Sequence, residues 1–83
     1  MKAANARTVG HLSLTVAAQI RAERASAGLT QDKIIAASGV SRSTYLRLES
    51  GKRPADITQI GGICDALNLD LVTFFERVKE RMG

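Results

Sequence analysis

Apolar residues recur every three or four positions in several separate segments of this chain, which is the pattern of amphipathic helices. The first such pattern begins near Leu14, and Gly28 suits the left-handed residue that ends a helix, so a helix is predicted over residues 15–27. Residues 1–13 show no sustained period and are interpreted as a flexible N-terminal arm. No stretch alternates apolar and polar residues, so no sheet is expected.

Capping residues divide the rest of the chain into four further predicted helices. A side chain suited to capping a helix N-terminus stands before each apolar pattern, at Thr30, Ser41, Asp56 and Asp70. Residues suited to ending a helix follow the first three patterns, at Gly39, Gly51 and Asn68. Helices are therefore expected over about 31–38, 42–50, 57–67 and 71–82. The third of these contains Gly61 and Gly62, each costing about 1 kcal/mol relative to alanine, so it is the least secure.

The two short helices over 31–38 and 42–50 are joined by a glycine turn, which is the geometry of a helix-turn-helix motif. The second helix of such a motif can enter the DNA major groove, provided that its inner face is apolar and its outer face polar. The residues expected to face inward are Val40, Tyr45 and Leu48, and those expected to face outward are Arg42, Ser43, Thr44 and Arg47. Arginine suits a guanine edge because it donates two hydrogen bonds, to O6 and N7.

Residues 28–54 resemble the DNA-binding module of the Cro/CI-type phage repressors, also called the Xre family. The matching residues are Gly28-Leu29-Thr30-Gln31, Ile34, Gly39-Val40-Ser41, Leu48-Glu49, Gly51 and Pro54. The resemblance extends more weakly from Val16 to Phe75. It implies an all-α, compact five-helix, lambda repressor-like domain over residues 14–83, with the helix-turn-helix at its second and third helices. It also implies a transcriptional regulator that binds double-stranded operator DNA, of the phage or prophage repressor type.

The resemblance also implies roles for individual residues. Base contacts are expected from Arg42, Ser43 and Arg47, and phosphate contacts from Gln31, Thr44, Lys52 and Arg53. Ser41 is expected to cap its helix, and its hydroxyl can also approach a phosphate because helix N-termini favour anions. Arg24 and Glu49 match positions that form an ion pair in this family.

The last predicted helix has more apolar residues than one core-facing stripe requires. The candidate dimer-interface residues are Val72, Phe75, Val78 and Met82, and the alternative is a well-packed terminal helix. A homodimer is expected because a single recognition helix makes few base contacts. Two copies would read half-sites about 34 Å apart.

Composition and charge support a polyanion partner and exclude several other classes of protein. The chain has 83 residues and a net charge of +4. Residues 31–53 carry five basic side chains against two acidic ones, whereas residues 54–83 carry three basic and five acidic ones. Cys64 stands alone, so an intramolecular disulfide is excluded, and no apolar run is long enough to span a membrane. A cytoplasmic protein without cofactor or metal is expected.

Two other classes of function are alternatives to the operator-binding regulator. The first is an antitoxin-type or restriction-modification controller protein, which binds a partner protein, its own operator, or both. The second is an enzyme, which the sequence does not support because it has no nucleophile–base pair, no acidic cluster and no phosphate loop. The only histidine, His11, lies in the predicted arm.

Overall fold

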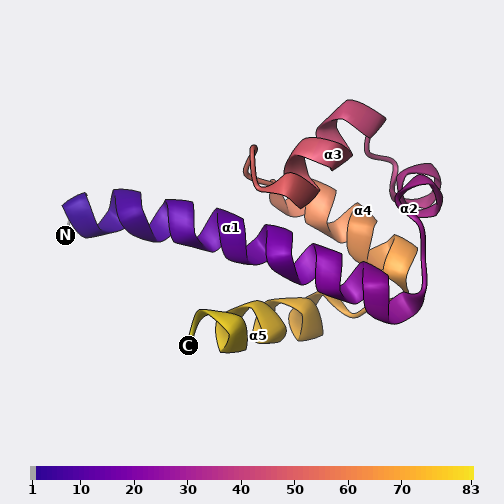
Figure 1. Ribbon diagram of the computed structural model, residues 1–83. Coiled ribbons are helices and arrows are strands. Elements are labelled where there is room, and N and C mark those ends of the chain that lie inside the picture. Colours follow the sequence, from indigo (N-terminus) through magenta and orange to yellow (C-terminus); the bar gives the residue numbers. More distant parts are fainter. Residues whose placement is uncertain (1) are drawn as a thin grey trace.

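Helices make up most of the chain in the computed structural model, which describes residues 2–83, with side chains described from Gly10 onward. The elements are α1 (Lys2–Ala27), α2 (Gln31–Ser38), α3 (Arg42–Ser50), α4 (Ile57–Leu67) and α5 (Leu71–Met82) (Figure 1). No strand occurs within this range. The predicted all-α class with five helices is confirmed. None of the described helices combines the length and the apolar composition that a membrane crossing requires.

The bounds of α2 to α5 follow from their capping residues, as predicted. The side chains of Thr30, Ser41, Asp56 and Asp70 each accept a hydrogen bond from the backbone N–H three residues later. The Gln59 Oε1 accepts a hydrogen bond from the Asp56 backbone N–H at 3.0 Å, which completes the capping box. Helices α2, α3 and α4 end at residues in the left-handed conformation, Gly39, Gly51 and Asn68. Local sequence is therefore sufficient to set where these helices begin and end.

The start of α1 differs from the prediction. The helix begins at Lys2 rather than near residue 15, so the segment interpreted as an arm is helical from Lys2 onward. Met1 and the side chains of residues 2–9 lie outside the described part of the chain. Residues 2–13 lack an apolar stripe, which is why periodicity did not indicate a helix there, but alanine, lysine and arginine all favour helix without one. The flexibility of this segment stays a prediction.

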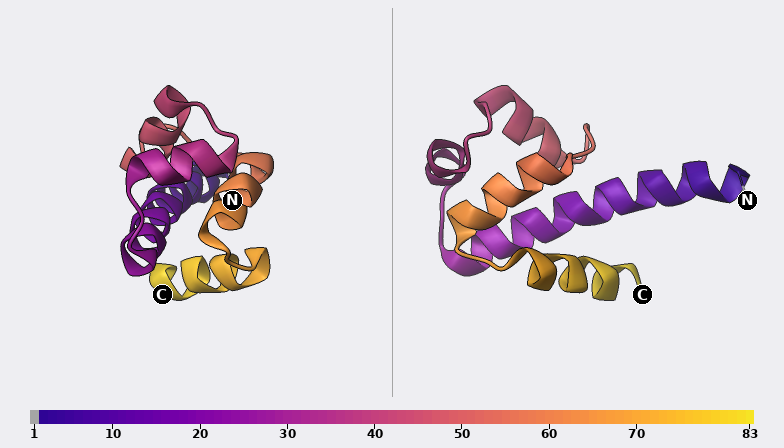
Figure 2. Two further views of the ribbon diagram at one scale, coloured as in Figure 1. Left: turned by 90° about the vertical axis from the view of Figure 1, so that its right-hand side faces the viewer. Right: turned by 180° about the vertical axis from the view of Figure 1, so that it is seen from behind.

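Helix α1 is the axis on which the other helices are arranged. Figure 1 shows α3 and α4 on one side of α1 and α5 on the other, and the rear view in Figure 2 shows the same order. The N-terminal half of α1 projects beyond the other helices in both views. The core between them is mostly aliphatic, and its largest fully buried side chains include Ile20, Ile34, Tyr45 and Phe74.

A glycine inside α4 allows α4 to pack closely against α2. A Cβ atom added at Gly62 would lie 2.2 Å from the backbone carbonyl oxygen of Ser38, the last residue of α2. A Cβ atom added at the neighbouring Gly61 would meet nothing within 4 Å. The low helix propensity of Gly62 is thus offset by the packing of α2, the first helix of the motif, whereas that of Gly61 has no such compensation.

Helix α5 is bound to α1 by a row of polar contacts as well as by apolar packing. Arg77 pairs with Glu23 at 2.8 Å, and the Arg81 Nε donates to Gln19 Oε1 at 2.8 Å. The hydrogen bond and charge of Glu23 raise the pKa of Arg77. Val78 is only 2% exposed and lies in the core of its own chain, which corrects its assignment to a dimer interface. Val72, six residues earlier on α5, is 64% exposed.

Candidate nucleic-acid interface

Helix α3 has one buried face and one face open to solvent. Tyr45, Leu48 and Glu49 are buried, at 0%, 2% and 4% exposure. The exposed positions of α3 include Arg42, Ser43 and Arg47, the three residues predicted to contact bases. Because buried positions recur at three- and four-residue spacing, the polar side chains between them share the outer side of the helix. Figure 1 shows α3 at the edge of the molecule, on the side of α1 away from α5.

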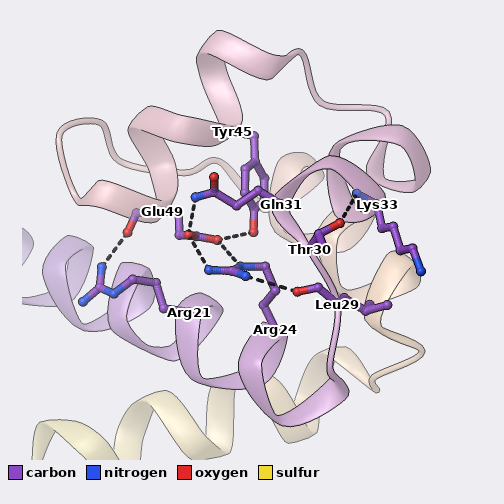
Figure 3. Close-up of polar contacts among 8 residues, drawn as sticks. All are labelled: Arg21, Arg24, Leu29, Thr30, Gln31, Lys33, Tyr45 and Glu49. Atoms are coloured by element: carbon purple, nitrogen blue, oxygen red, sulfur yellow. Dashed lines mark hydrogen bonds and ion pairs between the residues drawn. The ribbon is translucent and has the colours of Figure 1, made fainter.

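A single buried carboxylate, that of Glu49, connects the inner face of α3 to α1 and α2 (Figure 3). The predicted ion pair with Arg24 is present and is bidentate, with Nε to Oε2 at 2.8 Å and Nη2 to Oε1 at 3.1 Å. The Gln31 Nε2 donates to Oε1 at 2.7 Å, and the Tyr45 hydroxyl donates to Oε2. The carboxylate therefore joins α1, α2 and α3 at one point.

These contacts shift the pKa values of the groups that make them. Burial alone would raise the pKa of Glu49, but hydrogen bonds from Arg24, Tyr45 and Gln31 lower it below its ordinary value. The pKa of Arg24 is raised, chiefly by its hydrogen bond to Glu49. The pKa of Tyr45 is raised by burial and by the same carboxylate. The ion pair thus stays charged at neutral pH, and Tyr45 remains a donor.

Two further contacts from α1 hold the ends of the motif. The Arg24 Nη1 donates to the backbone carbonyl of Leu29 at 3.1 Å, just before α2 begins. The Arg21 Nη1 donates to the backbone carbonyl of Glu49, near the end of α3 (Figure 3). These contacts come from side chains one turn apart on α1. Helix α1 therefore fixes how far α3 can tilt relative to α2.

The residues predicted to contact phosphates occupy three kinds of position. Gln31 is half-buried, and its amide already donates to Glu49, so sequence reasoning missed this internal contact. Ser41 caps α3 and donates to the Thr44 hydroxyl at 3.0 Å. Lys52 and Arg53 are exposed in the loop between α3 and α4. All of these residues belong to the motif or to the loop that follows it.

Sequence reasoning also missed an acidic residue on this face. The Asp32 Oδ1 pairs with the Arg42 Nη1 at 2.8 Å, which joins the first turn of α2 to the first turn of α3. The two residues are ten positions apart and belong to different helices, so no local pattern signals the pair. The spacing of Tyr45 and Glu49, by contrast, is one helical turn and would have indicated their contact.

Comparison with protein families gives a match to a helix-turn-helix domain over residues 15–74, which is well over half of the chain. The chain is a helix-turn-helix protein. The family expected from residues 28–54 is thereby confirmed, and with it the class of DNA-binding transcriptional regulators. Comparison with curated protein sequences gives no significant match.

Solved structures of regulators resemble this helix-turn-helix protein over most of its length. The clp gene regulator ClgR from Corynebacterium glutamicum has a TM-score of 0.79 and 25% identity, covering 87% of this chain and 94% of that one. A tyrosine-to-phenylalanine mutant of the restriction-modification controller protein C.Esp1396I has a TM-score of 0.81 and 25% identity, covering 87% of this chain and 96% of that one. The fold of this chain is therefore shared with two different regulators.

Proposed function

We propose that this helix-turn-helix protein is a sequence-specific regulator of the phage or prophage repressor type, which reads operator DNA in the major groove with α3. The observation that carries the proposal is that α3 has a buried inner face and an exposed outer face with two arginines, Arg42 and Arg47. A rigid helix with exposed guanidinium groups is what direct readout of guanine requires.

The remaining polar residues of the motif provide a second set of contacts, to the DNA backbone. We assign base contacts to Arg42, Ser43 and Arg47, and phosphate contacts to Gln31, Ser41, Thr44, Lys52 and Arg53. Gln31 keeps its side-chain oxygen and its second amide hydrogen for other partners while one hydrogen binds Glu49. Phosphate contacts of this kind fix the register of the protein on the duplex without reading its sequence.

The proposed regulator acts as a homodimer. Two exposed apolar side chains, Leu12 and Ile57, line a hollow of about 350 Å³, together with Val16, Phe75 and others. Ile57 is 60% exposed, and Val72 lies one turn before Phe75 on α5. Exposed apolar groups next to a hollow suit a two-fold interface, in which each copy fills the hollow of the other. Met82 remains a candidate at the end of α5, where it is half-buried.

The experiment that tests readout by α3 compares Arg47→Ala with a control of equal charge change. Preferred duplexes are first selected from a random DNA pool with the wild-type protein. We expect Arg47→Ala to weaken binding to the preferred duplex by about tenfold or more, and binding to random DNA much less, because a bidentate base contact is lost. Lys79→Ala removes the same charge from the exposed surface of α5, on the other side of α1, and should leave the preference unchanged.

Three outcomes would contradict the proposal in different ways. If selection yields no preferred duplex at moderate ionic strength, the protein is not a sequence-specific reader. If Arg47→Ala weakens both kinds of binding equally, Arg47 contacts a phosphate rather than a base. If Lys79→Ala has the same effect as Arg47→Ala, net charge and not the α3 face determines affinity.

A restriction-modification controller is the second candidate, and its support is the similarity to C.Esp1396I. Both candidates read DNA as dimers in our proposal, so they differ in where the preferred sequence lies. A preferred sequence that occurs upstream of restriction and modification genes would favour the controller. One that occurs at a phage or prophage promoter would favour the repressor.

A further inference from the structure

One arginine of the α3 outer face differs from the other cations of the interface because it is paired with an acid. The Arg42 Nη1 lies 2.8 Å from the Asp32 Oδ1, and the two side chains are 60% and 74% exposed. Arg47, Lys52 and Arg53 form no ion pair within residues 10–83. An acidic residue is thus placed on a face that otherwise attracts DNA.

The electrostatics of the two helix ends favour this pair. Arg42 is the first residue of α3, where the positive end of the helix dipole opposes a cation. Asp32 lies in the first turn of α2, where the dipole stabilises an acid. The carboxylate therefore offsets an unfavourable position for the guanidinium. It also limits the directions in which a long, flexible side chain can point.

The geometry of the pair leaves the guanidinium able to bind a base. The contact with Asp32 is made through Nη1, and the edge formed by Nε and Nη2 can still donate to a base. A guanine accepts two parallel hydrogen bonds from one such edge, through O6 and N7. An arginine held at one nitrogen has fewer orientations to lose when it binds, so the pair favours one base at one position.

We propose that Asp32 is a positioning residue that determines sequence specificity, by holding Arg42 in the orientation that reads one base pair and by repelling the phosphates of non-cognate DNA. This inference rests on the proposed function, since it requires that α3 reads base edges. It predicts that sequence discrimination and affinity for random DNA change in opposite directions. Loss of the carboxylate reduces discrimination at one base pair and strengthens binding to random DNA.

The test is the isosteric substitution Asp32→Asn, measured against the preferred duplex, its single-base-pair variants and a random duplex. We expect the preference at the base pair read by Arg42 to fall about fivefold, the scale of coupling between contacting residues. Binding to random DNA should become tighter, and its salt dependence should steepen by about one counterion, because Arg42 is free to contact a phosphate. Asp32→Glu, which keeps the charge, should retain most of the preference.

A double-mutant comparison separates positioning from a general effect on the fold. In an Arg42→Ala background, Asp32→Asn should no longer change the preference at any base pair. Thermal unfolding of each variant identifies a purely structural effect, which would weaken binding to all duplexes alike. The inference is overturned if Asp32→Asn keeps the wild-type preference, if it loosens binding to random DNA, or if Asp32→Asn still changes the base-pair preference in the Arg42→Ala background.

The failure of this inference and the failure of the proposed function are distinguishable. If the wild-type protein has no preferred duplex, the proposed function fails and the inference fails with it. If the wild-type protein has a preference that Arg42→Ala relaxes but Asp32→Asn does not, only the role of Asp32 is wrong. If Arg42→Ala relaxes no position, Arg42 reads no base and the inference is wrong, while readout by Arg47 is unaffected.

Discussion

At the scale of single residues, Glu49 determines how the recognition helix sits on the rest of the protein. Its carboxylate accepts hydrogen bonds from one residue of each of α1, α2 and α3, namely Arg24, Gln31 and Tyr45. A buried carboxylate with this many donors is stabilised in its charged form, and removal of that charge leaves Arg24 without its partner. The exposed face of α3 is therefore oriented by a residue that is itself buried.

The ion pair of Glu49 predicts how stability depends on pH. The pKa of Glu49 in the folded protein lies below its ordinary value of 4.5, so the folded state binds fewer protons than the unfolded chain in that range. The stability supplied by the pair is fully present above pH 4.5, and it is lost as the pH falls from there through the lowered pKa. Chemical denaturation between pH 3 and pH 7 should show this loss.

The substitution Glu49→Gln tests whether the loss of stability at low pH comes from this residue. We expect it to lower the free energy of unfolding at pH 7 by about 2 kcal/mol, the size of a lost charge-assisted hydrogen bond at a buried site. The difference from wild type should shrink on acidification. Glu76→Gln, at an exposed position of α5, should have little effect at any pH. An equal pH dependence in Glu49→Gln and wild type would mean that other carboxylates cause the acid sensitivity.

At the scale of elements, the two adjacent glycines of α4 have opposite effects on stability. Gly62 faces the carbonyl oxygen of Ser38 so closely that any side chain would push α2 and α4 apart, whereas Gly61 faces open space. The position of α2 relative to α4, and with it the base of the helix-turn-helix, depends on Gly62. Gly61 only lowers the helix propensity of α4.

Alanine substitutions at the two positions should therefore change stability in opposite directions. Gly61→Ala is expected to raise the free energy of unfolding by up to about 1 kcal/mol, because alanine favours the helix and meets no neighbour. Gly62→Ala is expected to lower it by about 2 kcal/mol, because the added methyl overpacks the contact with α2. Urea unfolding of the two variants measures both. Stabilisation by Gly62→Ala would show that α2 can move away from α4 at little cost.

At the scale of the whole molecule, α1 separates two surfaces with different chemistry. On one side lies α3, with its polar and basic outer face, and on the other lies α5, which polar contacts hold to α1. Exposed apolar residues of α4 and α5 lie outside the DNA-reading face of our proposal. In our proposal, a second copy and a duplex therefore bind to different surfaces and can bind at the same time.

The proposed dimer predicts that a charge at Val72 separates the copies. Val72 is 64% exposed in the second position of α5, where an acid is favoured by the helix dipole, so Val72→Asp should leave the monomer folded. We expect the apparent mass in sedimentation equilibrium to fall from that of two copies to that of one. Leu46→Asp changes an exposed leucine of α3 in the same way and should leave the dimer intact. A wild-type protein that sediments as a monomer would contradict the proposed dimer.

The sequence by itself determined the bounds of α2 to α5, because caps, left-handed residues and the spacing of apolar positions act within a few residues of each other. The family followed from the resemblance of residues 28–54. The sequence also determined that Arg42 and Arg47 point outward, since the buried positions of α3 fix the opposite face. The pair of Arg24 and Glu49 followed only from the resemblance to a family.

Tertiary structure alone decided which distant residues meet. The pair of Asp32 and Arg42, the contact of Gln31 with Glu49, and the close approach of α2 to Gly62 all depend on the angle between helices. The burial of Val78 does too, because an apolar residue at the end of a chain can face a core or a partner with the same local pattern. Periodicity gives the faces of a helix, but only packing decides what each face meets.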